Sequence, residues 1–363
     1  CRLPYLTPAK SGLRQLLNAC SAPQLFVGLV LLIAATLGEA MAEPSREKVI
    51  LDVDVGIDDA MAILFASKSP EIDLLGVTTV FGNASIEDST RNALFLAARC
   101  GLEVPVAQGA SVPLVAPPIP PVAYVHGRNG LGNVPVGEPS RALQAPVSAA
   151  EFIIAQSRLY PGELTLVPVG RLTNIALALR LDPTLPSRIK RIVLMGGAFD
   201  TRGNITPVAG ANTYGDPHAA DIVFQADWDV TAVGTDVTRQ VMIDQDDLDE
   251  LARRNPLAGG FVRDMTAFYL EFHRSIGVTG GFYIHDPTAL IYLVRPDLFE
   301  VTRAAIRVVT DGLAVGQTIA APYLESPAGT FTANRFNHYT SAVDHEAARA
   351  LLLNRLAEVE FVD

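Results

Sequence analysis

Short apolar runs alternate with helix-like segments along most of the chain. The strand-like runs cover 48–51, 72–80, 163–169, 189–195 and 229–235. Helical patterns lie between them, at about 60–66, 87–100 and 172–181. Strands that are apolar throughout and alternate with helices are typical of a parallel sheet covered by helices. The pattern therefore predicts an α/β fold with a mostly parallel central sheet flanked by helices.

The last third of the chain departs from this alternation. After about residue 243 the pattern turns helical and then strand-like over 303–320, which predicts a smaller C-terminal extension of helices and strands on the main sheet. Five prolines fall within 113–121, and such a stretch is typical of a rigid surface loop. Because neither a linker nor an internal repeat divides the rest, residues 43–363 are predicted to form one domain.

Residues 1–42 have the features of a secretory signal peptide. Lys10 and Arg14 precede an apolar run of 14 residues at 25–38, and Ala40-Met41-Ala42 offers small side chains for cleavage near Ala42. A run of this length is short for a membrane span, so a retained anchor is the alternative interpretation. We therefore expect a secreted or periplasmic protein without stable membrane association after cleavage.

Composition and charge narrow the function classes. Of 363 residues, 49% are hydrophobic and 18% are charged, so the chain can bury a large core. Cleavage after Ala42 would leave 25 basic and 38 acidic side chains, and a net charge of −13 argues against nucleic acid as a partner. Cys1 and Cys20 would leave with the signal peptide, and Cys100 alone cannot form an internal disulfide.

Four aspartates follow the first strand-like run within eight residues. Asp52, Asp54, Asp58 and Asp59 lie where that strand turns into a helix, and the carboxyl edge of an α/β sheet is the usual place for a ligand. Four carboxylates repel one another unless a cation neutralises them, and oxygen ligands favour calcium or magnesium over zinc. The alternative is that Asp58 and Asp59 only cap the helix, which accounts for one or two of the four.

Polar or small residues also follow the later strands. Asn83 ends the second, Gly170 and Asn174 follow the third, and Gly196 follows the fourth. Three Asp-Pro pairs, at 182, 216 and 286, each predict a helix start with Asp as the cap and Pro in the first turn. On local sequence alone, His285 next to the last pair would be an ordinary surface or core histidine.

Taken together and in order, these motifs resemble the inosine/uridine-preferring nucleoside hydrolase family. The matching segments are 52–59, 78–83, 125–132, 170–178, 193–198, 212–217 and 285–287. The similarity runs from about residue 48 to about residue 340. It implies a nucleoside-hydrolase-like catalytic domain that cuts the bond between ribose and base in a nucleoside. It also implies Ca2+ as the cofactor and a homo-oligomer, either a dimer or a tetramer.

The resemblance carries a role to each matching residue. The calcium ligands would be the side chains of Asp54, Asp59 and Asp286 and the backbone carbonyl of Val169. The residues around the substrate would be Asp58 and Asn212 at the ribose 2′- and 3′-hydroxyls, Asn83, Asn204 and Met195 at the sugar, and His126 on the base side. Asp54 would also be the catalytic base, and His285 would be the group that meets the departing base.

The chemistry of the reaction requires such residues, independently of the family resemblance. Breaking a ribosyl–base bond builds positive charge on the sugar, as in other glycoside hydrolyses. Calcium acidifies a bound water less than zinc does, so a carboxylate base such as Asp54 is needed. His285, with an ordinary pKa near neutrality, is expected to protonate or hydrogen-bond the leaving base, and the alternative is that it only orients Asp286.

Several residues depart from the family pattern, including Val55 in place of a proline and Arg128-Asn129 in place of an acidic loop. Gly210 and Ala211 stand where relatives commonly have a glutamate and an aromatic residue, so the carboxylate expected at the ribose 5′-hydroxyl is missing. Sugar binding is then weaker, or the substrate is larger at its 5′ position. Trp228 is expected in the core rather than against a base, and the base choice is predicted to be broad or pyrimidine-tolerant.

Two other functions fit parts of the sequence. Asp52-Val53-Asp54 resembles the start of haloacid-dehalogenase-like magnesium phosphatases, in which Asp52 would be the nucleophile. A catalytically impaired, secreted ribose- or nucleoside-binding protein is the other alternative, since Gly210 and Ala211 weaken the expected sugar site.

Overall fold

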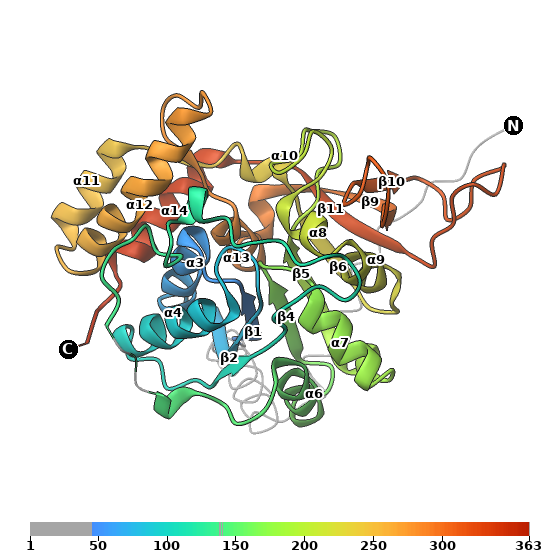
Figure 1. The fold of residues 1–363 in the computed structure, drawn as a ribbon, viewed down its shortest axis with the longest axis horizontal. Helices are drawn as coiled ribbons and strands as arrows, with labels where there is room; N and C mark the ends of the chain where they lie inside the picture. The colour runs from blue at the N-terminus through green and yellow to red at the C-terminus, as the bar shows by residue number, and fades with distance from the viewer. Residues whose placement is uncertain (1–45, 138, 140, 363) are drawn as a thin grey trace, which may run out of the picture. The chain divides into compact units, whose positions relative to one another are not determined.

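A long, mostly parallel sheet forms the centre of the described part of the chain, which comprises residues 46–137, 139 and 141–362 in the computed structural model (Figure 1). Nine strands in these residues pair in the order β10-β9-β11-β6-β5-β4-β1-β2-β3. The pairs from β11 to β3 are parallel, and β9 is antiparallel to both of its neighbours. The predicted α/β fold is confirmed, whereas the predicted signal peptide lies outside the described residues.

The strands of the central sheet are β1 (Glu47–Val53), β2 (Ile72–Thr79), β3 (Val106–Gln108), β4 (Leu164–Pro168), β5 (Ile189–Met195), β6 (Val230–Val233), β9 (Phe299–Val308), β10 (Thr318–Ala321) and β11 (Phe336–Val343). Of these, β1, β2, β4, β5 and β6 begin and end close to where the apolar runs predict them, whereas no run predicts β3 or β11. A separate antiparallel pair joins β7 (Met242–Ile243) to β8 (Phe282–Tyr283).

Two helical layers cover the sheet. One contains α3 (Ile57–Ser67), α4 (Ile86–Arg99), α11 (Gln245–Arg254), α12 (Ala258–Ser275), α13 (Asp286–Val294) and α14 (His345–Ala357). The other contains α6 (Ala149–Leu159), α7 (Thr173–Leu181) and α9 (Pro217–Gln225), and Figure 1 shows the two groups on opposite sides of β1, β4 and β5. The helices predicted near 87–100 and 172–181 are therefore confirmed to within a residue.

The middle of β1 is apolar because both faces of the strand are covered. In β1, Val49, Leu51 and Val53 pack into the core under α3, whereas Ile50 packs into the core under α6 and α7. All four side chains are fully buried. Alternate residues of a strand point to opposite faces, so a strand between two apolar layers needs apolar residues at every position.

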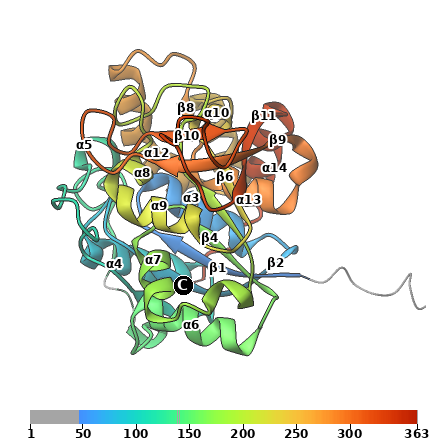
Figure 2. The same ribbon diagram turned by 90° about the vertical axis from the view of Figure 1, so that its right-hand side faces the viewer.

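The C-terminal extension joins the sheet at its edge. The run predicted over 303–320 is two strands, β9 and β10, because the chain turns between them at Gly312 and Gly316, whose φ angles are 74° and 82°. Strand β11 connects them to the parallel part of the sheet by pairing His338 with Thr231 in β6. These strands lie together in Figure 2 and lengthen the sheet rather than cover its face.

The proline-rich segment forms neither helix nor strand. Residues 114–121 are exposed or half-buried, as expected for a surface loop, and Pro113 is buried. The described residues, including this segment, fall into one compact unit. Among them, no helix combines the length and the apolar character that crossing a membrane requires.

The three Asp-Pro pairs have three different roles. Asp216 caps α9 as predicted, since its carboxylate accepts a hydrogen bond from the backbone N–H of Ala219 at 3.1 Å. Asp182 does not start a helix; it ends α7, and its carboxylate binds Thr184, Arg158 and Arg188. Asp286 is the first residue of α13, and its side chain is directed to the acidic cluster described below.

The register of the sheet brings three strand ends to one place. Val53 at the end of β1 pairs with Thr79 of β2, and Asp52 pairs with Pro168 of β4. The residues that follow these strands therefore lie side by side at the carboxyl edge. This edge carries the residues that the sequence selects as functional.

Candidate active site

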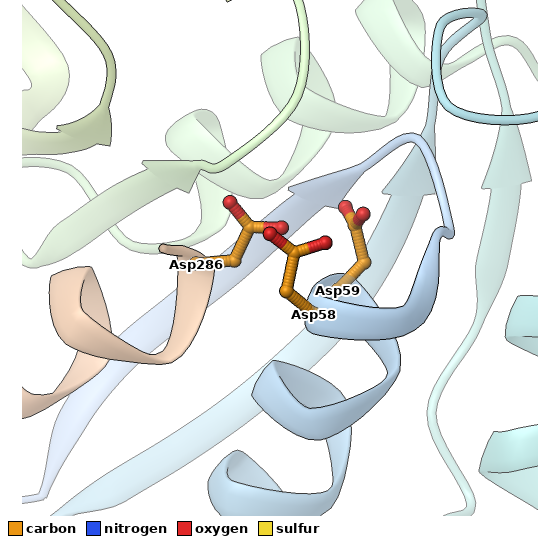
Figure 3. Close-up of side chains that lie close together, drawn as sticks. All are labelled: Asp58, Asp59 and Asp286. Carbon is orange, nitrogen blue, oxygen red and sulfur yellow. The ribbon is translucent and has the colours of Figure 1, made fainter. Parts of the chain in front are cut away.

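Three buried carboxylates meet above the carboxyl ends of the strands. Asp58 and Asp59 lie in the first turn of α3, and Asp286 lies in the first turn of α13. One oxygen from each lies within 4.8 Å of the others, and the side chains point toward one another in Figure 3. The predicted convergence of Asp286 on the N-terminal aspartates is therefore present.

Asp59 is held by the backbone at the start of α3. Its carboxylate accepts hydrogen bonds from the N–H groups of Asp54 at 3.0 Å and Gly56 at 2.9 Å. The side-chain amide of Asn83 donates to the same carboxylate at 3.0 Å. Helix capping thus explains part of the role of Asp59, and the Asp58 carboxylate also accepts backbone hydrogen bonds in the first turn of α3.

Several carboxylate oxygens in the cluster have no donor. Among the described residues, Asp54 Oδ1, Asp58 Oδ1 and Asp286 Oδ2 are buried without a hydrogen-bond partner. Burial raises the pKa of Asp58 to about 7 and the pKa of Asp54 and Asp286 well above the ordinary value. Unpaired buried oxygens are costly, and a hard divalent cation is the ligand that satisfies several of them at once. The donor set fits such a cation.

Asp54 lies beside these three carboxylates and has partners of its own. Its Oδ2 accepts a hydrogen bond from the backbone N–H of Asn83 at 2.7 Å and forms an ion pair with the guanidinium group of Arg171. It does not belong to the closest group of three, in which Asp58 stands instead. Of the predicted ligands, Asp59 and Asp286 are in direct proximity, and Asp54 is joined to Asp59 through its backbone N–H.

Asn212 ties the ends of two strands together. Its side-chain amide donates to the carbonyl oxygens of Val169 at 2.5 Å and Met195 at 3.0 Å, and it lies 3.5 Å from the sulfur of Met195. The helix that carries it, α8 (Ala211–Gly215), starts with the departure from the family pattern noted above. The Val169 carbonyl, predicted as a ligand, therefore faces the same region as Asn212.

A single pocket is lined by most of the predicted residues. Those that line it are Asp58, Asn83, His126, Met195, Asn204, Asn212, His285 and Asp286. Asp54, Asp59 and Val169 are not part of its lining, but each forms a hydrogen bond with Asn83 or Asn212. The sequence therefore selects residues that the fold brings together.

Both histidines are buried and neutral. His126, in α5 (Ala123–His126), accepts a hydrogen bond at Nδ1 from the backbone N–H of Ile57 at 3.1 Å. Nδ1 of His285 lies 2.7 Å from the hydroxyl of Thr238. Burial lowers the pKa of each histidine to about 3. The near-neutral pKa expected for His285 from sequence is wrong, because the sequence does not show how completely the ring is buried.

Aromatic residues from α12 and β8 form the outer wall of the pocket. Tyr269, Phe272, His273 and Tyr283 line it together with residues from α5. The hydroxyl of Tyr269 forms a hydrogen bond with Asp58, and its ring stacks on His126 with 5.5 Å between ring centres. Sequence reasoning missed this wall, since the same spacing of apolar residues is typical of any helix packed on a core.

Arg171 is a second residue that sequence reasoning left without a role. It follows Gly170 at the carboxyl end of β4 and is only 6% exposed. The sequence does contain one indication of a role for Arg171, because a charged residue is unusual at the end of a fully buried strand. By contrast, Asp52 accepts hydrogen bonds from Thr78 at 2.6 Å and Asn174 at 2.7 Å, so it braces the strands and is not presented as a nucleophile.

The fold is similar to those of solved nucleoside hydrolases. The family model described as inosine-uridine preferring nucleoside hydrolase matches residues 49–350. The chain therefore belongs to the inosine-uridine preferring nucleoside hydrolase family. It is an enzyme that hydrolyses ribonucleosides, its family is metal-dependent, and the phosphatase and binding-protein alternatives are not favoured.

Individual relatives are similar over most of their length. Uridine nucleosidase 1 of Arabidopsis thaliana is 48% identical over 276 residues, which cover 76% of this chain and 82% of that protein. A solved plant nucleoside hydrolase, PpNRh1, is 36% identical with a TM-score of 0.81 and covers 86% of this chain and 100% of its own. A purine-preferring ribonucleoside hydrolase from Gardnerella vaginalis is 34% identical with a TM-score of 0.80, over 86% of this chain and 99% of its own.

Proposed function

We propose that this enzyme cuts the N-glycosidic bond of ribonucleosides, releases free base and ribose, and depends on calcium. The observation that carries this proposal is the convergence of Asp58, Asp59 and Asp286, with unpaired buried oxygens in the cluster. The side chains of Asp54, Asp59 and Asp286 and the carbonyl of Val169 would hold the ion. When bound, calcium would orient the attacking water and the ribose hydroxyls and favour deprotonation of that water.

Calcium is favoured over zinc by the chemistry of the donors. Carboxylate and carbonyl oxygens suit calcium, whereas zinc sites in proteins usually include histidine or cysteine. Nδ1 of each of the three pocket histidines has a partner: the Ile57 N–H for His126, the Thr238 hydroxyl for His285 and the Tyr269 carbonyl for His273. Cys100 is half-buried in α4's C-terminal end and is not part of the pocket lining.

Asp54 is the proposed base. Its Oδ2 is held by Asn83 and Arg171, while its Oδ1 is buried without a donor and is free to accept a proton from water. Burial raises the pKa of Asp54, which makes the carboxylate a stronger base than one in solvent. The water oxygen then bonds to the anomeric carbon of ribose as the bond from that carbon to the base nitrogen breaks.

The departing base would meet His285 and His126. A hydroxyl of Thr238 that donates to Nδ1 of His285 leaves the ring proton on Nε2. A neutral imidazole in this form donates a hydrogen bond to the base instead of transferring a full proton. His126, with Nδ1 occupied by the Ile57 N–H, also has Nε2 available as a donor.

The sugar would lie between the acids and the amides. We assign Asp58 and Asn212 to the 2′- and 3′-hydroxyls, and Asn83, Asn204 and Met195 to the remaining sugar surface. The unpaired Oδ1 of Asp58 can accept a hydrogen bond from a hydroxyl. The aromatic wall offers flat apolar surface to a base. A broad or pyrimidine-tolerant base choice is therefore proposed, and Trp228 is buried in the core as predicted.

A ribose-release assay tests the proposed function. Inosine, uridine, cytidine and adenosine are each incubated with the enzyme, with calcium or with a chelator, and the reducing sugar is measured. We expect ribose from uridine and at least one purine nucleoside with calcium, and a loss of at least 100-fold with the chelator. Full activity after complete chelation would contradict the calcium requirement, and the absence of ribose from every substrate would contradict the reaction.

Two further expectations stay proposals. We propose that the enzyme is exported after cleavage near Ala42 and that it assembles as a dimer or tetramer, as the resemblance implies. N-terminal sequencing of the protein recovered outside the cytoplasm tests the first, and light scattering of the purified enzyme tests the second.

A further inference from the structure

Arg171 brings a buried positive charge into the acidic site. Its guanidinium group forms an ion pair with Asp54 and lies 3.3 Å from the side-chain oxygens of both Asn83 and Asn212. These three partners follow β1, β2 and the loop before α8, so one side chain connects three separate segments of the site. All three have a proposed role in binding or catalysis.

The surrounding backbone leaves room for this side chain. A Cβ atom on Gly82 would overlap the guanidinium group, and one on Gly215 would lie 2.7 Å from Nε of Arg171. Gly82 also has a φ angle of 152°, which L side chains rarely adopt. Two glycines from different segments thus leave the space that the arginine side chain occupies.

The charge of Arg171 lies beside the group of buried carboxylates. Asp54, Asp58, Asp59 and Asp286 are all buried, and Arg171 contacts Asp54 directly. A buried carboxylate is strongly destabilising unless an opposite charge or a metal ion is near it. Arg171 and a divalent cation would therefore both neutralise the Asp54 carboxylate. Each positive charge then reduces the electrostatic stabilisation that the other can contribute.

We propose that Arg171 is a positioning residue and an internal counter-charge for this site. It holds Asp54 and the amide oxygens of Asn83 and Asn212 in place, it stabilises the acidic cluster before a divalent ion binds, and it lowers the affinity of the site for that ion. The last point rests on the proposed calcium dependence, whereas the effect on stability does not.

Three variants test this proposal on the full-length enzyme. Arg171→Met removes the charge and keeps a long side chain, and Arg171→Lys keeps the charge with fewer donors. Arg180→Met is the matched control, because Arg180 lies on α7 and is exposed. The measurements are the thermal unfolding midpoint in chelator, the calcium dissociation constant by titration calorimetry, and kcat and KM for uridine.

For Arg171→Met we expect a lower midpoint in chelator, by several degrees, and calcium binding at least ~10-fold tighter than in the wild type. A residue with a merely structural role would not tighten calcium binding when removed. We also expect a larger fall in kcat than change in KM, since Asp54 loses one of its two anchors. Arg180→Met should match the wild type in every measurement.

Arg171→Lys should keep the chelator midpoint near that of the wild type and still lose kcat. An unchanged midpoint in Arg171→Met, or calcium affinity equal to or weaker than that of the wild type, would overturn the proposal. If Arg171→Met does not fold, the lysine variant decides: a midpoint lowered by several degrees despite the retained charge would overturn it. A wild type that binds no calcium would refute the proposed function, and the chelator midpoints would still test the counter-charge.

Discussion

The two oxygens of Asp54 have different surroundings, and this difference explains how one carboxylate can be both anchored and reactive. Oδ2 is fixed by the backbone N–H of Asn83 and by Arg171, whereas Oδ1 is buried without a donor. A base needs a fixed position and a free lone pair, and here Oδ2 supplies the first and Oδ1, which has no hydrogen-bond donor, supplies the second. The side chain is completely buried, so water in bulk does not compete for it.

Asp54→Asn should therefore remove the base while preserving the shape of the side chain. We expect kcat/KM for uridine to fall by at least about 100-fold, since positioned proton transfer contributes 10²–10⁴-fold. Asp73→Asn, a change at a partly exposed carboxylate of β2, serves as the control. A loss of less than tenfold in Asp54→Asn would contradict the assignment of the base.

Gly210 can accept a side chain without strain. Its φ and ψ angles are −75° and 151°, and a Cβ atom there would lie 3.4 Å from the backbone of Gly197. Gly210→Glu would supply the carboxylate that the resemblance to the family predicts at the ribose 5′-hydroxyl. We expect a several-fold lower KM for uridine with kcat nearly unchanged.

A matched substrate and a matched variant test whether the lower KM of Gly210→Glu comes from a contact with the 5′-hydroxyl. With 5′-deoxyuridine, which lacks the hydroxyl, Gly210→Glu should show no lower KM than the wild type. Gly210→Gln should give a smaller gain with uridine, because a neutral acceptor forms a weaker hydrogen bond than a carboxylate. An equal gain with both substrates would show that the new side chain acts elsewhere.

At the scale of secondary-structure elements, the apolar runs predict most of the sheet because buried parallel strands leave a clear signal. Strand β5 was predicted at its observed bounds. Strand β11 was missed because its sequence, Phe336–Val343, contains asparagine, histidine, threonine and serine among its apolar residues. Its place is set by pairing with β9 and β6, which are distant in sequence.

Asp182 shows how an element boundary depends on such distant partners. It was predicted to start a helix, yet it ends α7 and joins Arg158 of α6 to Arg188. Hydrogen bonds from Thr184 and Arg158 lower the pKa of Asp182 below its ordinary value of 3.8. The ionised form is favoured in the folded state, so its stabilisation is present above pH 3.8 and is lost as the pH falls further.

Asp182→Asn should accordingly lower the thermal unfolding midpoint at pH 7. The difference from the wild type should narrow when the pH is lowered below about 4, because the Asp182 carboxylate of the unfolded wild type then takes up a proton that folding has to release. Circular dichroism melts at several pH values measure both effects, with the exposed Asp311→Asn as control. A difference that stays constant with pH would contradict the ionic role.

At the scale of the whole molecule, the site exists only because the complete fold assembles it. The motifs predicted which residues meet, since their order along the chain matches a known family. They did not predict the aromatic wall from α12, the hydrogen bonds that engage Asn212, or the burial that keeps His285 neutral. These properties depend on how helices pack across the sheet, and no local spacing encodes them.

Calcium should stabilise the whole molecule, because an ion bound only by the folded state shifts unfolding by mass action. We expect the unfolding midpoint to rise with calcium concentration, and Asp286→Asn to remove most of that rise by deleting a ligand from α13. Asp297→Asn, at an exposed carboxylate after the same helix, is the control. An equal rise in Asp286→Asn and the wild type would place the ion elsewhere.

The most direct measurement is the anomalous difference map of a crystal soaked with calcium and ribose. The account predicts one peak about 2.3–2.6 Å from oxygens of Asp54, Asp59 and Asp286 and from the carbonyl of Val169, with the ribose hydroxyls beside it. An ion bound away from Asp286, or no ion at this edge of the sheet at saturating calcium, would contradict it.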